Sequence, residues 1–172
     1  MSGSGVEKFI NSVSFFDAFN EVEKHKFLSD QTCFVKFKEN DIVFKQGEQG
    51  DSLFLVLQGQ VGLYRLGHIK SVEGRVSLKK EEEKHITNLK SGVIFGEVSM
   101  LTNCKRNVTA RIFSKEVVLM KISKALIDNL NHLTQIKFHR QLLLSLAIHL
   151  DNMNSQFVDL KYEHDEYVKS HS

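Results

Sequence analysis

The pattern of apolar positions divides the chain into three regions. Residues 6–30 carry aromatic and aliphatic side chains at roughly helical spacing, which predicts short N-terminal helices. Residues 31–123 contain eight short segments rich in β-branched and aromatic residues, separated by Gly, Asn and Asp, which predicts eight strands. Such a series is typical of a β-sandwich, a barrel or a jelly roll. Residues 124–162 return to a helical pattern, and we expect residues 1–5 to be a leader or expression scar and residues 163–172 a polar tail.

The C-terminal helical region carries a second apolar pattern. Six residues follow one another at alternating spacings of three and four, as in a coiled coil: Leu143, Leu146, Leu150, Met153, Phe157 and Leu160. We call these residues the heptad seam. Burial of such side chains at about 1.5–3 kcal/mol each is ample for association. We therefore predict a homodimer through this helix; the alternative is that the same surface is buried within the chain.

Residues 66–85 interrupt the regular spacing of the strands. They are longer and more charged than a tight hairpin needs, and they contain the run KKEEEK at residues 79–84. The simplest interpretation is a solvated loop or an extension of two strands, and a docking segment is the alternative.

Composition excludes several classes of function. The chain of 172 residues suits one core with an appended helix, and a net charge of +2 without a basic stripe gives no case for direct nucleic-acid binding. No apolar run reaches the roughly 18 residues of a membrane span. The eight histidines show no metal-ligand spacing. Cys33 and Cys104 are predicted to be free thiols in a reducing compartment, which implies a cytoplasmic protein; the alternative is a disulfide.

Candidate chemistry is concentrated in residues 95–110, which read FGEVSMLTNCKRNVTA. A short helical turn after Gly96 would direct unpaired N–H groups at an anion, and the planar fork of Arg106 suits phosphate oxygens. Glu97 can accept hydrogen bonds from ligand hydroxyls. A small ligand with one negative charge, a ribose-like hydroxyl and a flat apolar part would satisfy this set. The alternative is an ion pair between Glu97 and Arg106 that closes the loop.

This segment resembles the phosphate-binding cassette of the cyclic nucleotide-binding domain family. Matching residues in the first half are Phe95, Gly96, Glu97, Val98, Ser99 and Leu101, and Arg106 matches the second half. Upstream, Asp51 and three glycines also fit the family's pattern, namely Gly47, Gly50 and Gly59. The resemblance covers residues 9–160. The family includes the catabolite-activator group and the regulatory subunits of cyclic-nucleotide-dependent kinases.

The resemblance implies a mainly β fold, an eight-stranded roll over residues 31–123 with short N-terminal helices and a long C-terminal hinge or dimer helix. It implies a cyclic nucleotide as ligand, with Glu97 on the ribose 2′-hydroxyl and Arg106 on the cyclic phosphate. Backbone N–H groups of Gly96, Ser99 and Asn107 would hold ribose or phosphate. The base would lie against apolar residues, namely Leu63, Val98 and Val108. Candidates for covering the base on the C-terminal helix are Asn154, Ser155 and Phe157, with Tyr162 a further candidate.

Two positions depart from the family's pattern. Lys105 stands where many members have Pro. Asn107 stands where Ala, Ser or Thr is usual, and in the family Thr often accompanies a preference for cGMP and Ala for cAMP. Because Thr is absent here, we favour cAMP and leave cGMP open.

Taken together, the sequence predicts a sensor. It contains no nucleophile–base set, P-loop, paired carboxylates or metal cluster, so we expect neither an enzyme nor a cofactor. Ligand binding would shift the population of the C-terminal helix and so control an effector domain or a partner. The alternative is a docking or assembly module that keeps the fold but binds no nucleotide.

Overall fold

The computed structural model describes residues 3–71 and 78–170. Four short helical elements come first: α1 (Gly3–Ile10), η1 (Ser14–Phe16), α2 (Glu21–Leu28) and η2 (Gln31–Cys33). Helix α2 begins at a capping box, in which Asn20 and Glu23 each bind the other's backbone N–H with their side chains. Helix α1 begins inside the segment 1–5 that we expected to be a leader, whose first two residues lie outside the described ones.

Eight strands follow, and they form two antiparallel sheets of four strands each. One sheet has the order β1–β8–β3–β6, with bounds Phe34–Lys38, Glu116–Ser123, Ser52–Gln58 and Ile94–Phe95. The other has the order β2–β7–β4–β5, with bounds Ile42–Phe44, Thr109–Ile112, Val61–Ser71 and Leu78–Leu89. The predicted eight-stranded β-roll with flanking helices is therefore confirmed.

The central strands bury both of their faces, and the two faces belong to different cores. Along β3, Leu53 and Leu55 pack against the helices, whereas Phe54 and Val56 point into the space between the sheets. Because successive side chains of a strand point to opposite sides, this run is almost wholly apolar instead of alternating. The first sheet is thus the middle layer of the molecule, between the second sheet and the helices.

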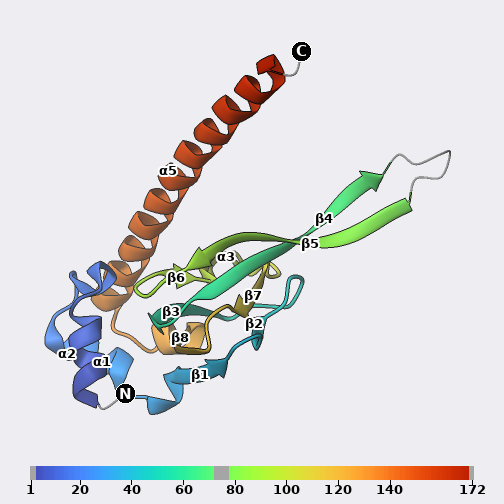
Figure 1. Cartoon of the computed structure of the whole chain (residues 1–172). Coiled ribbons are helices and arrows are strands. Elements are labelled where there is room, and N and C mark those ends of the chain that lie inside the picture. The colour runs from blue at the N-terminus through green and yellow to red at the C-terminus, as the bar shows by residue number, and fades with distance from the viewer. Residues whose placement is uncertain (1–2, 72–77, 171–172) are drawn as a thin grey trace.

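The chain ends in α4 (Lys124–Asp128) and in a single long helix, α5 (His132–Ser170). Figure 1 shows α5 leaving the roll beside the N-terminal helices and continuing well beyond the domain. At its base, Phe138 and Leu142 are buried in the core that the N-terminal helices cover. Helix α5 includes the part of the tail, residues 163–170, that we expected to be polar and loosely ordered; residues 171–172 lie outside the described ones.

Strands β4 and β5 form a hairpin much longer than the roll requires. They pair from Val61 with Leu89 to Ser71 with Leu78, and the outer part of the hairpin projects away from the roll in a different direction from α5 (Figure 1). In the charged segment, residues 66–71 and 78–85 are therefore an extension of two strands, one of the two simple interpretations of its sequence; residues 72–77 lie outside the described ones.

Several absences hold for residues 3–71 and 78–170. In these ranges no helix is long and apolar enough to cross a membrane. No cluster of His, Cys, Asp and Glu within them has the arrangement of a metal site. Cys33 is buried, Cys104 is exposed, and both are free thiols, as predicted.

Candidate functional site

The cassette helix α3 (Glu97–Thr102) starts directly after the two-residue strand β6, at Gly96. Gly96 has φ of 79°, in the left-handed region that a residue with a Cβ rarely adopts. A Cβ at this position would also lie 2.7 Å from Nη1 of Arg106. Glycine is therefore required twice, for the turn from strand to helix and for the close approach of the guanidinium.

The guanidinium of Arg106 is turned into the protein, and the residue is only 5% exposed. Its Nη1 donates to the carbonyl oxygen of Gly96 at 2.6 Å and to Ser99 Oγ at 2.6 Å. Its Nη2 donates to the carbonyl oxygen of Ser52 at 2.7 Å. Its Nε is buried and has no hydrogen-bond partner among the described residues. The cassette helix and strand β3 thus hold Arg106 from two sides.

Arg106 also packs against an aromatic ring and a glycine. Its Cζ lies 4.2 Å from the centre of the Phe44 ring, a cation–π contact in the interior of the roll. A Cβ on Gly50 would lie 2.5 Å from Cζ, from Nε and from Ser99 Oγ. Burial lowers the pKa of Arg106, and the nearby carboxylates of Asp51, Glu97 and Glu48 oppose this shift. The charge of Arg106 is therefore partly desolvated, and these carboxylates offset part of that cost.

The backbone around Arg106 is bonded to the loop before β3. Gly47 N–H donates to the Arg106 carbonyl at 2.8 Å, and Arg106 N–H donates to the Glu48 carbonyl at 2.8 Å. Gln49 forms an antiparallel bridge with Lys105, and its Nε2 donates to the carbonyl of Asn103 at 3.1 Å. These contacts fix the loop that carries Arg106 without help from a regular strand.

Glu97 lies at the start of α3 and is half-buried. Burial raises the pKa of its carboxyl, while its own backbone N–H and the positive groups of His149 and Arg106 lower it. No ion pair between Glu97 and Arg106 forms within 4.0 Å, although the structure describes both residues. The loop-closing ion pair that we considered as an alternative is thus replaced by hydrogen bonds from Arg106 to Gly96, Ser99 and Ser52.

The other candidate residues fall into two groups. Leu63 and Val108 are half-buried and pack against the core between the sheets, whereas Val98 and Asn107 are exposed at the surface of the cassette. The candidates for covering the base are all exposed and lie on the outer part of α5: Asn154, Ser155, Phe157 and Tyr162. Covering a base with any of them would require a different placement of α5, and that role stays a prediction.

The sequence did not reveal three contributors to this neighbourhood. Phe44 was recognised only as an apolar strand residue, and Ser52 contributes a backbone carbonyl, which has no sequence signature. His149 lies on α5, fifty-two positions beyond Glu97, and is the last half-buried residue of that helix. His149 lies seven positions beyond the apolar Leu142, which is helical spacing for the same face, but nothing in the sequence tied His149 to the cassette.

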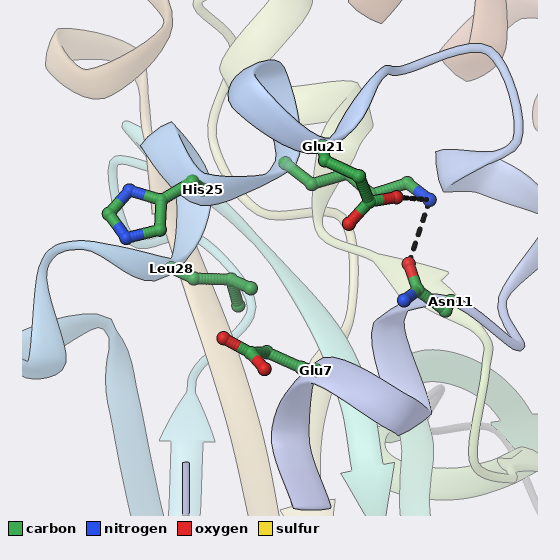
Figure 2. Close-up of a pocket in the computed structure, with 6 residues that line it drawn as sticks. Glu7, Asn11, Glu21, His25 and Leu28 are labelled. Atoms are coloured by element: carbon green, nitrogen blue, oxygen red, sulfur yellow. Dashed lines mark hydrogen bonds and ion pairs between the residues drawn. The ribbon is translucent and has the colours of Figure 1, made fainter. Parts of the chain in front are cut away.

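A separate pocket of about 200 Å³ lies among the N-terminal helices. Figure 2 shows it, and its lining residues are Glu7, Asn11, Glu21, Lys24, His25 and Leu28. The ammonium group of Lys24 is already bound to Asn11 Oδ1 at 2.7 Å and to Glu21 Oε1 at 3.1 Å. This pocket belongs to α1, α2 and the turn that joins them, and it contains no residue of the cassette.

The roll, the cassette turn at Gly96 and the buried arginine together define a cyclic nucleotide-binding domain. The family model described as "Cyclic nucleotide-binding domain" matches residues 34–131, more than half of the chain. The chain belongs to this family, as the resemblance of the cassette predicted.

Relatives with named functions come from both nucleotide classes. The chain is 26% identical over 122 residues to a cGMP-dependent protein kinase of Eimeria tenella, covering 69% of this chain and 11% of the kinase. It is 25% identical over 109 residues to a cAMP-dependent protein kinase regulatory subunit of Blastocladiella emersonii, covering 63% of this chain and 24% of the subunit. The chain thus spans a quarter or less of the length of these curated relatives.

Among solved structures, the fold is similar to a cyclic nucleotide-binding domain from Methylobacillus flagellatus kt. The TM-score is 0.68 at 17% identity, and the match covers 91% of this chain and 82% of that chain. At this identity the likeness concerns the fold alone, and it includes the flanking helices as well as the roll.

Proposed function

We propose that this chain is a cyclic nucleotide sensor, a regulatory domain and not an enzyme. Arg106 binds the cyclic phosphate, and Glu97 accepts a hydrogen bond from the ribose 2′-hydroxyl. The N–H groups at the start of α3 and after Arg106 complete the anion site, in Gly96, Ser99 and Asn107. The base lies on the apolar residues Leu63, Val98 and Val108.

The observation that carries this proposal is the unpaired Nε of Arg106. A buried donor without a partner costs about 1–3 kcal/mol, so the site is under-satisfied at this atom. A phosphate oxygen that reached Nε would remove this cost and form a charge-assisted hydrogen bond. Family membership supplies the class of ligand, because a cyclic nucleotide has one phosphate charge and a ribose hydroxyl.

Isothermal titration with cAMP and cGMP tests the proposal, with c-di-GMP as a control ligand. Arg106→Lys should weaken binding at least tenfold, because a point charge cannot replace the fork of a guanidinium and a charged hydrogen bond is worth about 1.5–3 kcal/mol. Arg111→Lys is the matched control: Arg111 is bound to Glu83 at 2.8 Å on the second sheet, so its replacement should leave affinity within about twofold. No heat from either nucleotide at tens of micromolar protein would refute the sensor.

We propose cAMP as the preferred nucleotide, on the basis of the residue after Arg106. Asn107 is exposed at the cassette, and the Thr that often accompanies cGMP preference is absent. Asn107→Thr should shift the ratio of the two dissociation constants toward cGMP, and Asn107→Ala should shift it toward cAMP. A ratio that neither variant changes would mean that selectivity resides elsewhere.

The signal would leave the roll through α5. The imidazole of His149 on α5 is near enough to Glu97 to influence the pKa of its carboxyl, so the ribose-binding group and the output helix share one environment. Ligand binding would shift the population of α5 positions, with a coupling of about 1–3 kcal/mol, and so control an effector or a partner protein. Hydrogen exchange of α5 with and without nucleotide would measure this, and equal protection of α5 in both states would contradict it.

A second copy of the chain is the partner that we propose for the heptad seam. Five of its six residues are exposed, and Leu146 is half-buried. Sedimentation should show a dimer that Leu150→Asp dissociates. Ile148→Asp is the matched control, because Ile148 is equally exposed, 62% against 60%, but lies off the seam. A monomeric wild type, or equal effects of the two variants, would refute the seam as the interface.

A docking or assembly module without a nucleotide is the second candidate function. It is favoured by the inward orientation of Arg106, whose hydrogen bonds to Gly96, Ser99 and Ser52 give it a structural role. A wild type that gives no titration heat, together with a large loss of thermal stability in Arg106→Lys, would select this function over the sensor.

We also propose a cytoplasmic location. Cys104 is an exposed free thiol beside the cassette, and such thiols persist in reducing compartments. Cell fractionation would test this, and recovery of the protein from an oxidising compartment would contradict it.

A further inference from the structure

The hydroxyl of Ser99 lies between the cassette helix and Arg106. Ser99 is 4% exposed, and its Oγ accepts from Arg106 Nη1 at 2.6 Å and donates to the Gly96 carbonyl at 3.2 Å. Both the donor and one acceptor position of this hydroxyl are therefore in use inside the protein. The expected role of Ser99 in the cassette concerns only its backbone N–H, so the side chain has no assigned task.

The hydrogen bonds of Arg106 divide its five N–H donors unequally. Three are bound to the protein: both on Nη1, to Gly96 and Ser99, and one on Nη2, to Ser52. The remaining two are the unpaired Nε–H and one N–H of Nη2. Nε and Nη2 lie on the same edge of a guanidinium, so a phosphate oxygen that accepts from the unpaired Nε–H would also lie next to Nη2.

The contacts of Nη1 therefore determine how this edge is oriented. Gly96 O and Ser99 Oγ occupy the donors of Nη1 and tie that end of the guanidinium to the first turn of α3. Gly50 permits the arrangement, because a Cβ there would lie 2.5 Å from both Arg106 Cζ and Ser99 Oγ. A guanidinium held in this way loses little rotamer freedom when an anion binds its other edge.

We propose that the Ser99 side chain is a positioning residue for phosphate recognition, which anchors Nη1 of Arg106 so that the edge of Nε and Nη2 is kept for the ligand. This inference rests on the proposed function, since it concerns the same site. Ser99 acts through Arg106 and on the phosphate alone, so its removal affects ligands with a phosphate and spares ligands without one.

The test compares a cyclic nucleotide with its nucleoside. Wild type and Ser99→Ala are titrated with cAMP, and adenosine is measured by competition; cGMP and guanosine replace them if wild type prefers cGMP. Loss of one hydrogen bond to a charged group should weaken cyclic nucleotide binding about 3- to 10-fold. Nucleoside affinity should change less than about twofold, because no phosphate is present to be positioned.

Two further variants separate positioning from a general loss of structure. Thr102→Ala removes another hydroxyl of α3, one that donates to the Val98 carbonyl at 2.6 Å and does not contact Arg106. It should change neither affinity by more than about twofold. Ser99→Cys keeps the size of the side chain but offers only a weak acceptor, so it should behave like Ser99→Ala, and it decides the question if Ser99→Ala fails to fold.

The outcomes distinguish this inference from the proposed function. Tighter or unchanged cyclic nucleotide binding in Ser99→Ala and Ser99→Cys overturns the positioning role, as does an equal loss for nucleotide and nucleoside, while the sensor stands. A wild type that binds neither cAMP nor cGMP overturns the sensor and the positioning role together.

Discussion

The two halves of α5 belong to one continuous helix but depend on different surroundings. In the inner half, residues 132–149, Phe138 stacks on Phe27 at 5.8 Å, and Lys137 Nζ lies 2.8 Å from Glu23 Oε2. In the outer half, residues 150–170, every residue is exposed. The inner half is therefore held by tertiary contacts across the chain, and the outer half is held in this structure by its own backbone hydrogen bonds.

This difference indicates which interactions stabilise the helical conformation of each half of α5. Most helical stability in proteins comes from packing of an apolar face against the rest of the structure. The inner half has this packing. The outer half exposes Leu150, Met153, Phe157 and Leu160 in a line, so an unpaired α5 would leave these apolar side chains in water. If α5 pairs with a second copy as proposed, the outer half is the part whose stability depends on protein concentration.

The largest expected effect separates two phenylalanines of the same helix. Phe138→Ala should lower the free energy of unfolding by about 3–5 kcal/mol, because it empties a fully buried position. Phe157→Ala should change it by less than about 0.5 kcal/mol in dilute protein. Urea unfolding at low concentration measures both. Similar losses in the two variants would mean that the halves do not differ as described.

The next effect concerns the carboxylate that binds the base of α5. Glu23→Gln should lower the free energy of unfolding by about 1–3 kcal/mol, since Glu23 accepts from Lys137, Thr134 and the Asn20 backbone. The control is Glu21→Gln, whose exposed pair with Lys24 should contribute less than about 1 kcal/mol. If both variants lose the same free energy of unfolding, the contact of Glu23 with α5 contributes no more to stability than an exposed ion pair.

A smaller effect of the same origin should appear on acidification. The Lys137 ammonium and the Asn20 N–H lower the pKa of Glu23 below the ordinary glutamate value. Its contribution is therefore complete above that value and is lost as the pH falls through the folded-state pKa. The difference in stability between wild type and Glu23→Gln should shrink on this descent. A constant difference from neutral to acid pH would show that the charge of Glu23 contributes nothing.

The smallest expected effect tests what determines the stability loss on substitution in α5: the face of the helix that carries the residue, or the residue's position along the helix. Leu144 lies in the inner half but on its outer face, and Leu144→Ala should change the free energy of unfolding by less than about 0.5 kcal/mol. Leu142→Ala, two positions away and buried, should cost about 2–5 kcal/mol. A large loss in Leu144→Ala would reveal a contact of that face with a second copy.

Local pattern predicted the fold well where burial dictates the sequence. All eight strands lie where β-branched and aromatic residues gather, because both faces of the first sheet and one face of the second are buried. The pattern failed where burial ends. It could not distinguish a charged loop from a two-stranded ribbon at residues 66–71 and 78–85, nor a polar tail from the end of α5. These charged segments carry no apolar period that would reveal a strand or a helix.

The candidate site was predicted in part for a related reason. Residue identity singled out Glu97 and Arg106. The structure places Glu97 at the start of α3 and the guanidinium of Arg106, from the loop after α3, against the first turn of that helix. The inward orientation of Arg106 could not be predicted, because two of its three acceptors are backbone carbonyls, of Gly96 and Ser52. Its aromatic contact with Phe44 depends on the pairing of distant strands, which no local pattern specifies.

The carboxylate of Glu23 also links the order of synthesis to the order of assembly. It joins the capping box of α2 to Thr134 and Lys137, which follow it by 111 and 114 residues. Phe15 and Phe27, translated early, pack against Phe138 at 5.4 and 5.8 Å. During synthesis, the contacts of the N-terminal helices with α5 therefore cannot form until the base of α5 has left the ribosome, and until then the aromatic side chains that Phe138 covers stay uncovered. A chain interrupted before Phe138 would leave that cluster open to aggregation.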